Sequence, residues 1–135
     1  MAVEVTLAVR MKLKPGYRAA VLHSPEGYLV DLAPAGVSID YALDGQYDWI
    51  QVFVKNRAEI QELFPSLYPA LKPNTLLWIS YPKATSGIQT DLSRDHGWDA
   101  VTGLKWVTLV SINSTWSAFA MRLPKPGEKA ADWTR

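Results

Sequence analysis

The chain has 135 residues, of which 48% are hydrophobic and 20% are charged, and its formal net charge is +1. This length predicts one domain with a real core. The near-neutral charge argues against nucleic acid as a partner, because no cluster of lysine and arginine is ready to neutralise a row of phosphates. The absence of cysteine excludes disulfides, thiolate catalysis and cysteine-based metal sites. With no signal-peptide pattern and no apolar run near the roughly 18 residues of a membrane span, we expect a cytoplasmic protein that does not bind a membrane.

The first third of the chain predicts two strands and a helix. The runs at residues 17–22 and 37–43 predict the strands, the second because apolar and polar residues alternate in it. Between them, residues 24–26 predict a helix start, with serine at the N-cap, proline at the first helical position and an acid in the first turn. This helix ends by Pro34 or Gly36. Residues 3–13 also alternate, and by period alone they predict a strand.

The middle of the chain predicts a strand, a helix and a further strand. Residues 47–54 end in a nearly continuous apolar run, which is typical of a strand buried on both faces of a parallel sheet. Asn56, with Glu59 three residues later, makes a variant of the capping box and predicts a helix start. Pro65 is expected to kink this helix or to end it early. The apolar stripe of the helix comprises Ile60, Leu63, Phe64, Leu67 and Leu71. Residues 76–81 predict the next strand.

The last third of the chain completes an α/β pattern. Residues 91–104 predict helix, in one piece or in two pieces broken at Gly97. Residues 106–112 and 116–123 predict an antiparallel hairpin, because only a short turn joins them. Strands that alternate with helices predict a single, mostly parallel Rossmann-like sheet of about six strands, with helices on both faces and the antiparallel hairpin at the end. Residues 1–123 form the domain, and residues 124–135 are expected to be a flexible tail.

Two segments and the terminal hairpin resemble S-adenosylmethionine-dependent methyltransferases. Residues 12–22 (KLKPGYRAAVL) are similar to the run that enters the first strand of these enzymes, and residues 71–79 (LKPNTLLWI) to a late helix-to-strand passage. The resemblance implies a truncated methyltransferase-like topology, with residues 37–43 at one edge of the sheet and residues 106–112 at the other. It also favours a short helix within residues 3–13. The third strand-helix unit of the enzymes is missing, which leaves residues 37–43 as an edge strand.

The chain departs from these enzymes where their first strand meets the cofactor. Their strand ends in a glycine-rich loop, which lets the backbone approach the cofactor closely. Here residues 23–28 read HSPEGY, with one glycine and a proline that removes a backbone donor. This difference argues against a cofactor.

Most of the chain also resembles a family of small bacterial proteins of unknown function. The residues that carry this resemblance are 14–16 (KPG), 24–27 (SPEG), 81–83 (YPK), 86–87 (SG), 90–92 (TDL) and 115–117 (TWS). The resemblance supports the predicted fold and implies no activity.

Candidate ligand-binding residues lie where the strands end, because ligands of open α/β sheets bind beyond the carboxyl ends of the strands. The loop after residues 76–81 combines one cation, two hydroxyls and a glycine ahead of a helix start predicted at Thr90, so it could hold an anion. Its glycine and lysine do not have the order or spacing of a P-loop. The candidate residues are Lys83, Ser86, Gly87, Thr90, His23, Ser24, Lys55 and Asn56. The alternative is a solvated surface loop in which Thr90 only caps a helix.

We assign no catalytic residue and no metal ligand. His23 could act as a base with Glu26 or Asp40, but a polar loop residue without a role is the alternative that we prefer. A triad of Ser24, His23 and Asp40 is rejected, because adjacent side chains rarely face each other and no nucleophile elbow is present. Histidines and carboxylates do not recur at metal-ligand spacing. The tryptophans at positions 49, 78, 106 and 116 fall on predicted strands, where we expect most of the tryptophans to pack in the core.

The sequence therefore favours a non-catalytic domain that binds a small anionic ligand or a protein partner. The alternative is a divergent S-adenosylmethionine-dependent methyltransferase. Because unpaired edge strands are normally covered or paired, we also expect either a homodimer through residues 37–43 or coverage of that edge by the amino-terminal segment.

Overall fold

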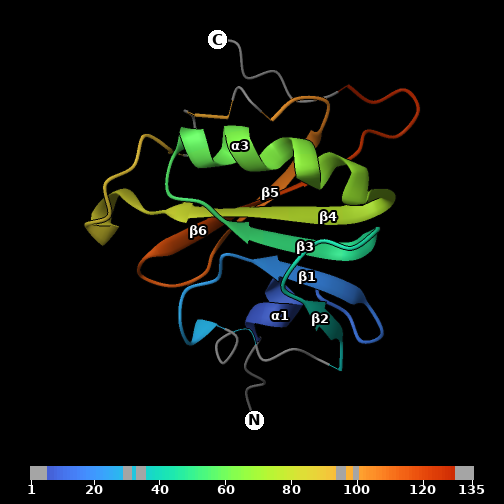
Figure 1. Cartoon of the computed structure of the whole chain (residues 1–135), viewed down its shortest axis with the longest axis horizontal. Coiled ribbons are helices and arrows are strands. Elements are labelled where there is room, and N and C mark those ends of the chain that lie inside the picture. The colour runs from blue at the N-terminus through green and yellow to red at the C-terminus, as the bar shows by residue number, and fades with distance from the viewer. Residues whose placement is uncertain (1–5, 29–31, 33–35, 94–96, 99–100, 130–135) are drawn as a thin grey trace.

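The computed structural model describes residues 6–28, 32, 36–93, 97–98 and 101–129. Its β-sheet lies between helix α1 and helix α3, which cover opposite faces (Figure 1). In chain order the elements are α1 (Leu7–Arg10), β1 (Arg18–Leu22), β2 (Ser38–Asp40), β3 (Tyr47–Phe53), α3 (Arg57–Leu67), a 3-10 turn (Tyr68–Ala70), β4 (Leu71–Pro82), a second 3-10 turn (Ala84–Ser86), β5 (Lys105–Ser111) and β6 (Trp116–Arg122). None of the helices in this described part is long and apolar enough to cross a membrane.

The six strands lie in the order β2-β1-β3-β4-β6-β5. The first four are parallel, and β6 is antiparallel to both of its neighbours. The predicted Rossmann-like sheet, its closing hairpin and the two predicted edge strands are thus confirmed. Strand β2 is shorter than predicted, and it pairs with only the first three of the five residues of β1. Whether a second copy of the chain pairs with this edge stays a prediction.

The alternating amino-terminal segment contains a helix, so the strand that its period predicts is wrong. The Thr6 hydroxyl accepts a hydrogen bond from the Val9 N–H (3.3 Å) and caps α1. Leu7, Ala8 and Met11 are buried against the sheet, which is the spacing of one helix face. Burial of this helical face therefore favours the helix over the strand that the alternation predicts.

The helix predicted to start at residues 24–26 starts later. Pro25, Glu26 and Gly27 form a turn that the Tyr28 N–H closes onto the Pro25 carbonyl (3.2 Å), and helical backbone begins at Tyr28. Gly27 has a φ of +80°, in the left-handed region that interrupts a right-handed helix. Leu32 is also helical, whereas the predicted end near Pro34 lies outside the described residues.

Helix α3 follows the predicted cap and ends close to the predicted breaker. The Asn56 side-chain oxygen accepts from the Glu59 N–H (3.0 Å). Three members of the predicted stripe, Ile60, Phe64 and Leu67, are buried against the sheet. The helix ends two residues after Pro65, and Leu71 begins β4 rather than a further helical turn.

No helix occurs among the described residues of 91–104, so that prediction is wrong for them. Gly97 has a φ of +99°, and a Cβ atom on it would lie 2.4 Å from a Leu92 methyl carbon, so the chain turns tightly there. The Trp98 indole donates to the Ser93 carbonyl (2.7 Å). Packing of Trp98 against Tyr81 and Phe119 stabilises this irregular segment and overrides its helix propensity.

The start of β4 differs from the prediction, and an ion pair holds the segment that follows β6. Strand β4 begins at Leu71, earlier than the strand predicted at residues 76–81, and takes in Pro73. Beyond β6, the Glu128 carboxylate accepts two hydrogen bonds from the Arg122 guanidinium (2.7 and 3.0 Å). That contact lowers the pKa of Glu128 to about 2. Flexibility of the tail stays a prediction.

Candidate functional site

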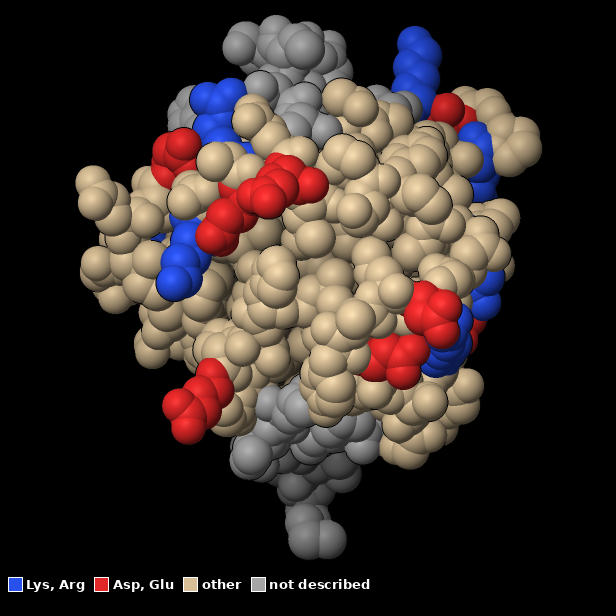
Figure 2. Space-filling view, viewed as in Figure 1, with Lys and Arg blue, Asp and Glu red and all other residues tan. Residues whose placement is uncertain are grey.

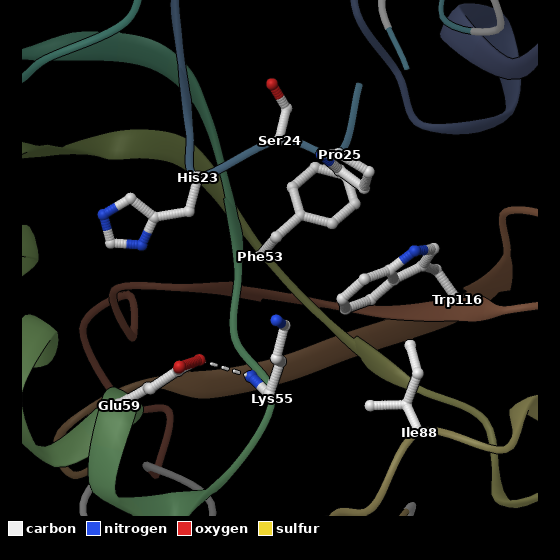
Figure 3. Close-up of a pocket in the computed structure, with 8 residues that line it drawn as sticks. All are labelled: His23, Ser24, Pro25, Phe53, Lys55, Glu59, Ile88 and Trp116. Atoms are coloured by element: carbon white, nitrogen blue, oxygen red, sulfur yellow. Dashed lines mark hydrogen bonds between the residues drawn. The ribbon is translucent and has the colours of Figure 1, made fainter. Parts of the chain in front are cut away.

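A pocket of about 530 Å³ lies at the carboxyl ends of β1 and β3. The chain leaves β1 toward β2 over the face that α1 covers, and it leaves β3 through α3 over the opposite face. Neighbouring strands whose connections run in opposite directions leave a crevice between them, which is where open α/β sheets bind ligands. The pocket is lined by His23, Ser24, Pro25, Phe53, Lys55, Glu59, Ile88 and Trp116 (Figure 3).

Aromatic rings form the apolar wall of the pocket. The Phe53 ring packs edge-on against Trp116, with centroids 5.1 Å apart, and against Tyr28, with centroids 4.7 Å apart. Pro25 and Ile88 extend this wall on either side (Figure 3). A wall of this kind is suited to an apolar group, because packing fixes the orientation of the rings, although Phe53 is only 3% and Trp116 only 8% exposed.

A row of buried, hydrogen-bonded polar side chains supports the aromatic wall. The Tyr28 hydroxyl lies 2.6 Å from the Gln51 side-chain oxygen, and the Gln51 amide donates to the Ser80 hydroxyl (2.9 Å). Gln51 and Ser80 are fully buried on adjacent strands, two residues before Phe53 and Pro82 respectively. Buried polar groups that satisfy one another in this way fix the register of β3 and β4 under the pocket.

Three titratable side chains border the pocket. The Lys55 side chain extends between Glu59 and Trp116 with its nitrogen toward Phe53 (Figure 3). Its ammonium has no hydrogen bond or ion pair within the described part of the chain. The Glu59 carboxylate instead accepts from the Lys55 backbone N–H (2.6 Å). Lys55 is therefore a cation without an acid partner, among the residues described, at the mouth of an apolar pocket.

Two backbone amides at the start of helix α3 are already hydrogen-bonded within the protein. The Glu59 N–H bonds to Asn56, and the Arg57 N–H bonds to the Asp91 carboxylate (2.8 Å). Asn56, a predicted ligand residue, is thus used as a helix cap. Because these two amides are already bonded, one to a carboxylate and one to an amide oxygen, an anion in the pocket is best placed at the Lys55 ammonium.

His23 has an unusual backbone for a residue with a side chain. Its φ is +59°, in the left-handed region, and it follows directly on the last residue of β1. Non-glycine residues in that region cost free energy and are enriched at binding sites. The chain turns here as a glycine would allow, but it places an imidazole at the edge of the pocket (Figure 3). His23 has no hydrogen-bond partner among the residues that the structure describes, and Asp40, its proposed acid, bonds to Arg18 and Tyr47 instead.

The loop that follows β4, which carries the predicted ligand residues Lys83, Ser86, Gly87 and Thr90, contributes only Ile88 to the lining of the pocket. Its hydroxyls serve local turns: Ser86 accepts from the Ile88 N–H (3.2 Å), and Thr90 accepts from the Leu92 N–H (3.0 Å). Gly87 ends the 3-10 turn with a φ of +83°. Thr90 caps no helix, because the described residues after it are irregular. Lys83 is directed to Ser111 at the end of β5.

The structure thus brings together three of the eight predicted residues, His23, Ser24 and Lys55. It adds the aromatic residues Phe53 and Trp116, which the sequence assigned to strands and, for Trp116, to the core. Trp116 is 8% exposed, so it belongs both to the core and to the pocket wall. No group of three or more histidine, aspartate or glutamate side chains that could hold a metal ion occurs in the described ranges.

Comparison with known proteins identifies the fold. No protein-family model matches the chain, and no curated protein matches it in sequence. Among solved structures it is similar to the ribosomal protein L11 methylase of Lactobacillus delbrueckii subsp. bulgaricus, with 13% identity and a TM-score of 0.54 over 87% of this chain and 75% of that one. It is also similar to a point mutant of MtNAS in complex with S-adenosylmethionine, with 13% identity and a TM-score of 0.53 over 87% of this chain and 59% of that one.

A tRNA methyltransferase gives the same result. The B. subtilis enzyme TrmK is 9% identical, with a TM-score of 0.50 over 91% of this chain and 68% of that one. Identities this low establish the fold alone. The chain has the Rossmann-like, methyltransferase-like fold that its sequence resembles.

Proposed function

We propose that this chain is a non-catalytic domain that binds a small ligand with a flat apolar part and an anionic group. The observation that carries this proposal is the Lys55 ammonium, which lies without an acid partner in the described part of the chain beside Phe53 and Trp116 (Figure 3). The apolar part lies against the two rings, and the anionic group lies at Lys55; His23 and Ser24 line the same pocket. Such pockets combine apolar walls with a few polar groups that orient the ligand.

A non-catalytic role is favoured by the state of the titratable side chains. A general base needs an oriented proton path and a partner that holds its tautomer. His23 has no such partner among the described residues, and the Glu59 carboxylate is held by a backbone N–H. Binding needs neither of these arrangements.

Matched ligands test the proposal. Adenosine monophosphate, adenosine and inorganic phosphate are titrated into the protein by calorimetry, preceded by a thermal-shift screen of nucleotides, phosphates and carboxylates. We expect the monophosphate to bind at least tenfold more tightly than adenosine, because a charge-assisted hydrogen bond contributes about 1.5–3 kcal/mol. Equal binding of the monophosphate and adenosine, or no binding of any ring-bearing anion in the screen, contradicts the proposal.

The second candidate is a methyltransferase that uses S-adenosylmethionine. It is favoured by the position of the pocket at the strand ends of a fold whose neighbours include the S-adenosylmethionine complex of MtNAS. The sequence of residues 23–28 argues against this candidate. The family resemblance leads us to expect a glycine-rich loop there, but the segment reads HSPEGY. We therefore expect no useful binding of S-adenosylmethionine by calorimetry. A micromolar dissociation constant would transfer the conclusion to this candidate.

A further inference from the structure

Two cations of the molecule converge on one serine at the end of β5. The Arg10 guanidinium, at the end of α1, donates to the Ser111 carbonyl oxygen (2.6 Å). The Lys83 ammonium, at the end of β4, donates to the Ser111 hydroxyl oxygen. Arg10 and Lys83 are 101 and 28 residues away from Ser111 in sequence, so the fold brings the charges together.

Neither cation is neutralised within the described part of the chain, where no acidic side chain forms an ion pair with Arg10 or Lys83. The Arg10 and Lys83 charges repel each other, because both side chains bond to Ser111, and an anion bound between them would remove that repulsion. Arg10 and Ser111 are exposed and Lys83 is partly exposed, so an anion from solution can reach them.

The N–H and O–H groups of Arg10, Lys83 and Ser111 that remain unused indicate which anion would fit. Because the Ser111 oxygen accepts from Lys83, its own O–H can donate to a ligand. Arg10 uses one of its five N–H groups on Ser111, and the Lys83 ammonium uses one of its three. A phosphate group matches this set, because its oxygens accept several charge-assisted hydrogen bonds from different directions.

The loop that carries Lys83 is anchored on both sides. The Lys83 backbone N–H donates to the Thr115 carbonyl (2.7 Å), and the 3-10 turn of residues 84–86 follows directly. The preceding residue, Pro82, pairs with Trp116 across β4 and β6. Anchoring reduces the conformational entropy that a flexible lysine loses when it binds.

We propose that Arg10, Lys83 and Ser111 form a second binding site, for a phosphate group, separate from the pocket around Lys55. The site is independent of the proposed function: it does not require a ring-bearing ligand, and its residues do not line the pocket. Its phosphate is either free in solution or carried as a monoester by another molecule.

Phosphate titrations at constant ionic strength test the site. Inorganic phosphate and methyl phosphate are titrated by calorimetry against wild type and Lys83→Ala, with chloride as the balancing ion. Wild type is expected to bind one equivalent saturably, and Lys83→Ala at least tenfold more weakly. Tighter binding of methyl phosphate than of inorganic phosphate indicates a monoester as the source, and the reverse indicates free phosphate; both orders support the site. Absence of saturable binding of either probe by wild type overturns it.

Three further variants distinguish this site from a general charge effect, from the pocket and from a structural role. Lys14→Ala removes an exposed cation elsewhere, and equal weakening by it would show that only general charge matters, which overturns the proposal. Lys55→Ala should leave phosphate affinity at this site unchanged, so that failure here and failure of the pocket are distinguishable. Arg10→Lys keeps the charge and the fold: weakened phosphate binding with an unchanged melting temperature supports the site. Unchanged phosphate binding by both Arg10→Lys and Lys83→Ala assigns the contacts a purely structural role and overturns it.

Discussion

The two ends of the β-sheet arrange their charged side chains differently. At the amino ends of the strands, basic and acidic groups pair within a cluster of Arg18, Asp40, Tyr47, Asp48 and Lys72, here called the amino-end cluster. At the carboxyl ends, Arg10, Lys55 and Lys83 have no acid partner among the described residues. In Figure 2, red and blue side chains adjoin at the right of the view, on the side where β1 and β3 begin, and also at the left, so the contrast rests on the ion pairs and not on proximity.

The amino-end cluster satisfies its own charges. The Arg18 guanidinium bonds to Asp40 (3.2 Å) and to the Gln46 carbonyl (2.8 Å), and it lies 4.2 Å from the centre of the Tyr47 ring. Burial of Tyr47, with its hydrogen bond to Asp40, raises the pKa of its hydroxyl. The charges at the amino ends thus pair within the fold, whereas the cations at the carboxyl ends have no acid partner among the described residues, as the proposed ligand sites require.

The largest effect is expected from Arg18→Ala. The change removes hydrogen bonds to Asp40 and to two backbone carbonyls, together with the contact with Tyr47. We expect the free energy of unfolding to fall by about 2–3 kcal/mol, because several charge-assisted contacts are lost at once from a partly exposed site. Urea denaturation measures this change, and calorimetry with the pocket ligand should show unchanged affinity.

Arg18→Lys is the matched control, because it keeps the charge and loses the planar fork. It should lie between wild type and Arg18→Ala in stability. If Arg18→Ala is as stable as wild type, the amino-end cluster has no structural role, and the contrast between the two ends fails.

In contrast to Arg18→Ala, Lys55→Ala should weaken ligand binding and leave stability almost unchanged. Removing the ammonium from the pocket should weaken the binding of an anionic, ring-bearing ligand about tenfold, which is about 1.4 kcal/mol. Stability should change by no more than about 0.5 kcal/mol, because the ammonium of this exposed residue makes no hydrogen bond or ion pair with the described residues. Calorimetry and urea denaturation of the same samples measure both quantities. A marked loss of stability with unchanged affinity would make Lys55 a structural residue.

Acid should affect the amino-end cluster through Asp48. The hydrogen bond from the Lys72 ammonium, followed by that from the Arg18 N–H, lowers the pKa of Asp48. A carboxylate with a lowered folded-state pKa contributes stability that is complete above its unfolded value of about 3.9 and is lost as the pH falls through the folded value. Asp48→Asn should therefore flatten the decline of stability between about pH 5 and pH 2, by about 1 kcal/mol given the partial exposure of the pair. If urea denaturation gives wild type and Asp48→Asn the same slope over this range, the assignment to Asp48 is wrong.

The sequence predicts the carboxyl-end site in part, for a local reason. His23, Ser24 and Lys55 follow directly on parallel strands, and the ends of such strands meet at one edge whatever the loops do. Asn56 and Glu59 likewise mark the start of α3 through contacts between near neighbours. Features of this kind depend on residues within a few positions of each other.

The unpredicted part depends on distant contacts. Trp116 reaches the pocket only through the antiparallel pairing of β6 with β4, and Ile88 only through the turns around Ser86. The contact of Lys83 with Ser111 also needs the finished sheet. A helix is predicted at residues 91–104, but none occurs among the described residues of this range, where Gly97 adopts a positive φ and packs closely on Leu92. Local propensity contains none of this information.

The smallest effect concerns the backbone of His23, and it compares two substitutions at one position. His23→Gly and His23→Ala both remove the imidazole, so they differ only in how well they adopt a φ of +59°. Alanine in the left-handed region costs about 1–2 kcal/mol, whereas glycine adopts it freely but loses about 0.4–1 kcal/mol more entropy on folding. We therefore expect His23→Gly to be more stable than His23→Ala by about 0.5–1 kcal/mol, measured by urea denaturation of both proteins in one buffer. Ligand affinity should fall to the same extent in both variants if the imidazole contacts the ligand. Equal stability of the two would mean that the turn relaxes without strain, and the left-handed backbone would then no longer distinguish this end of the sheet.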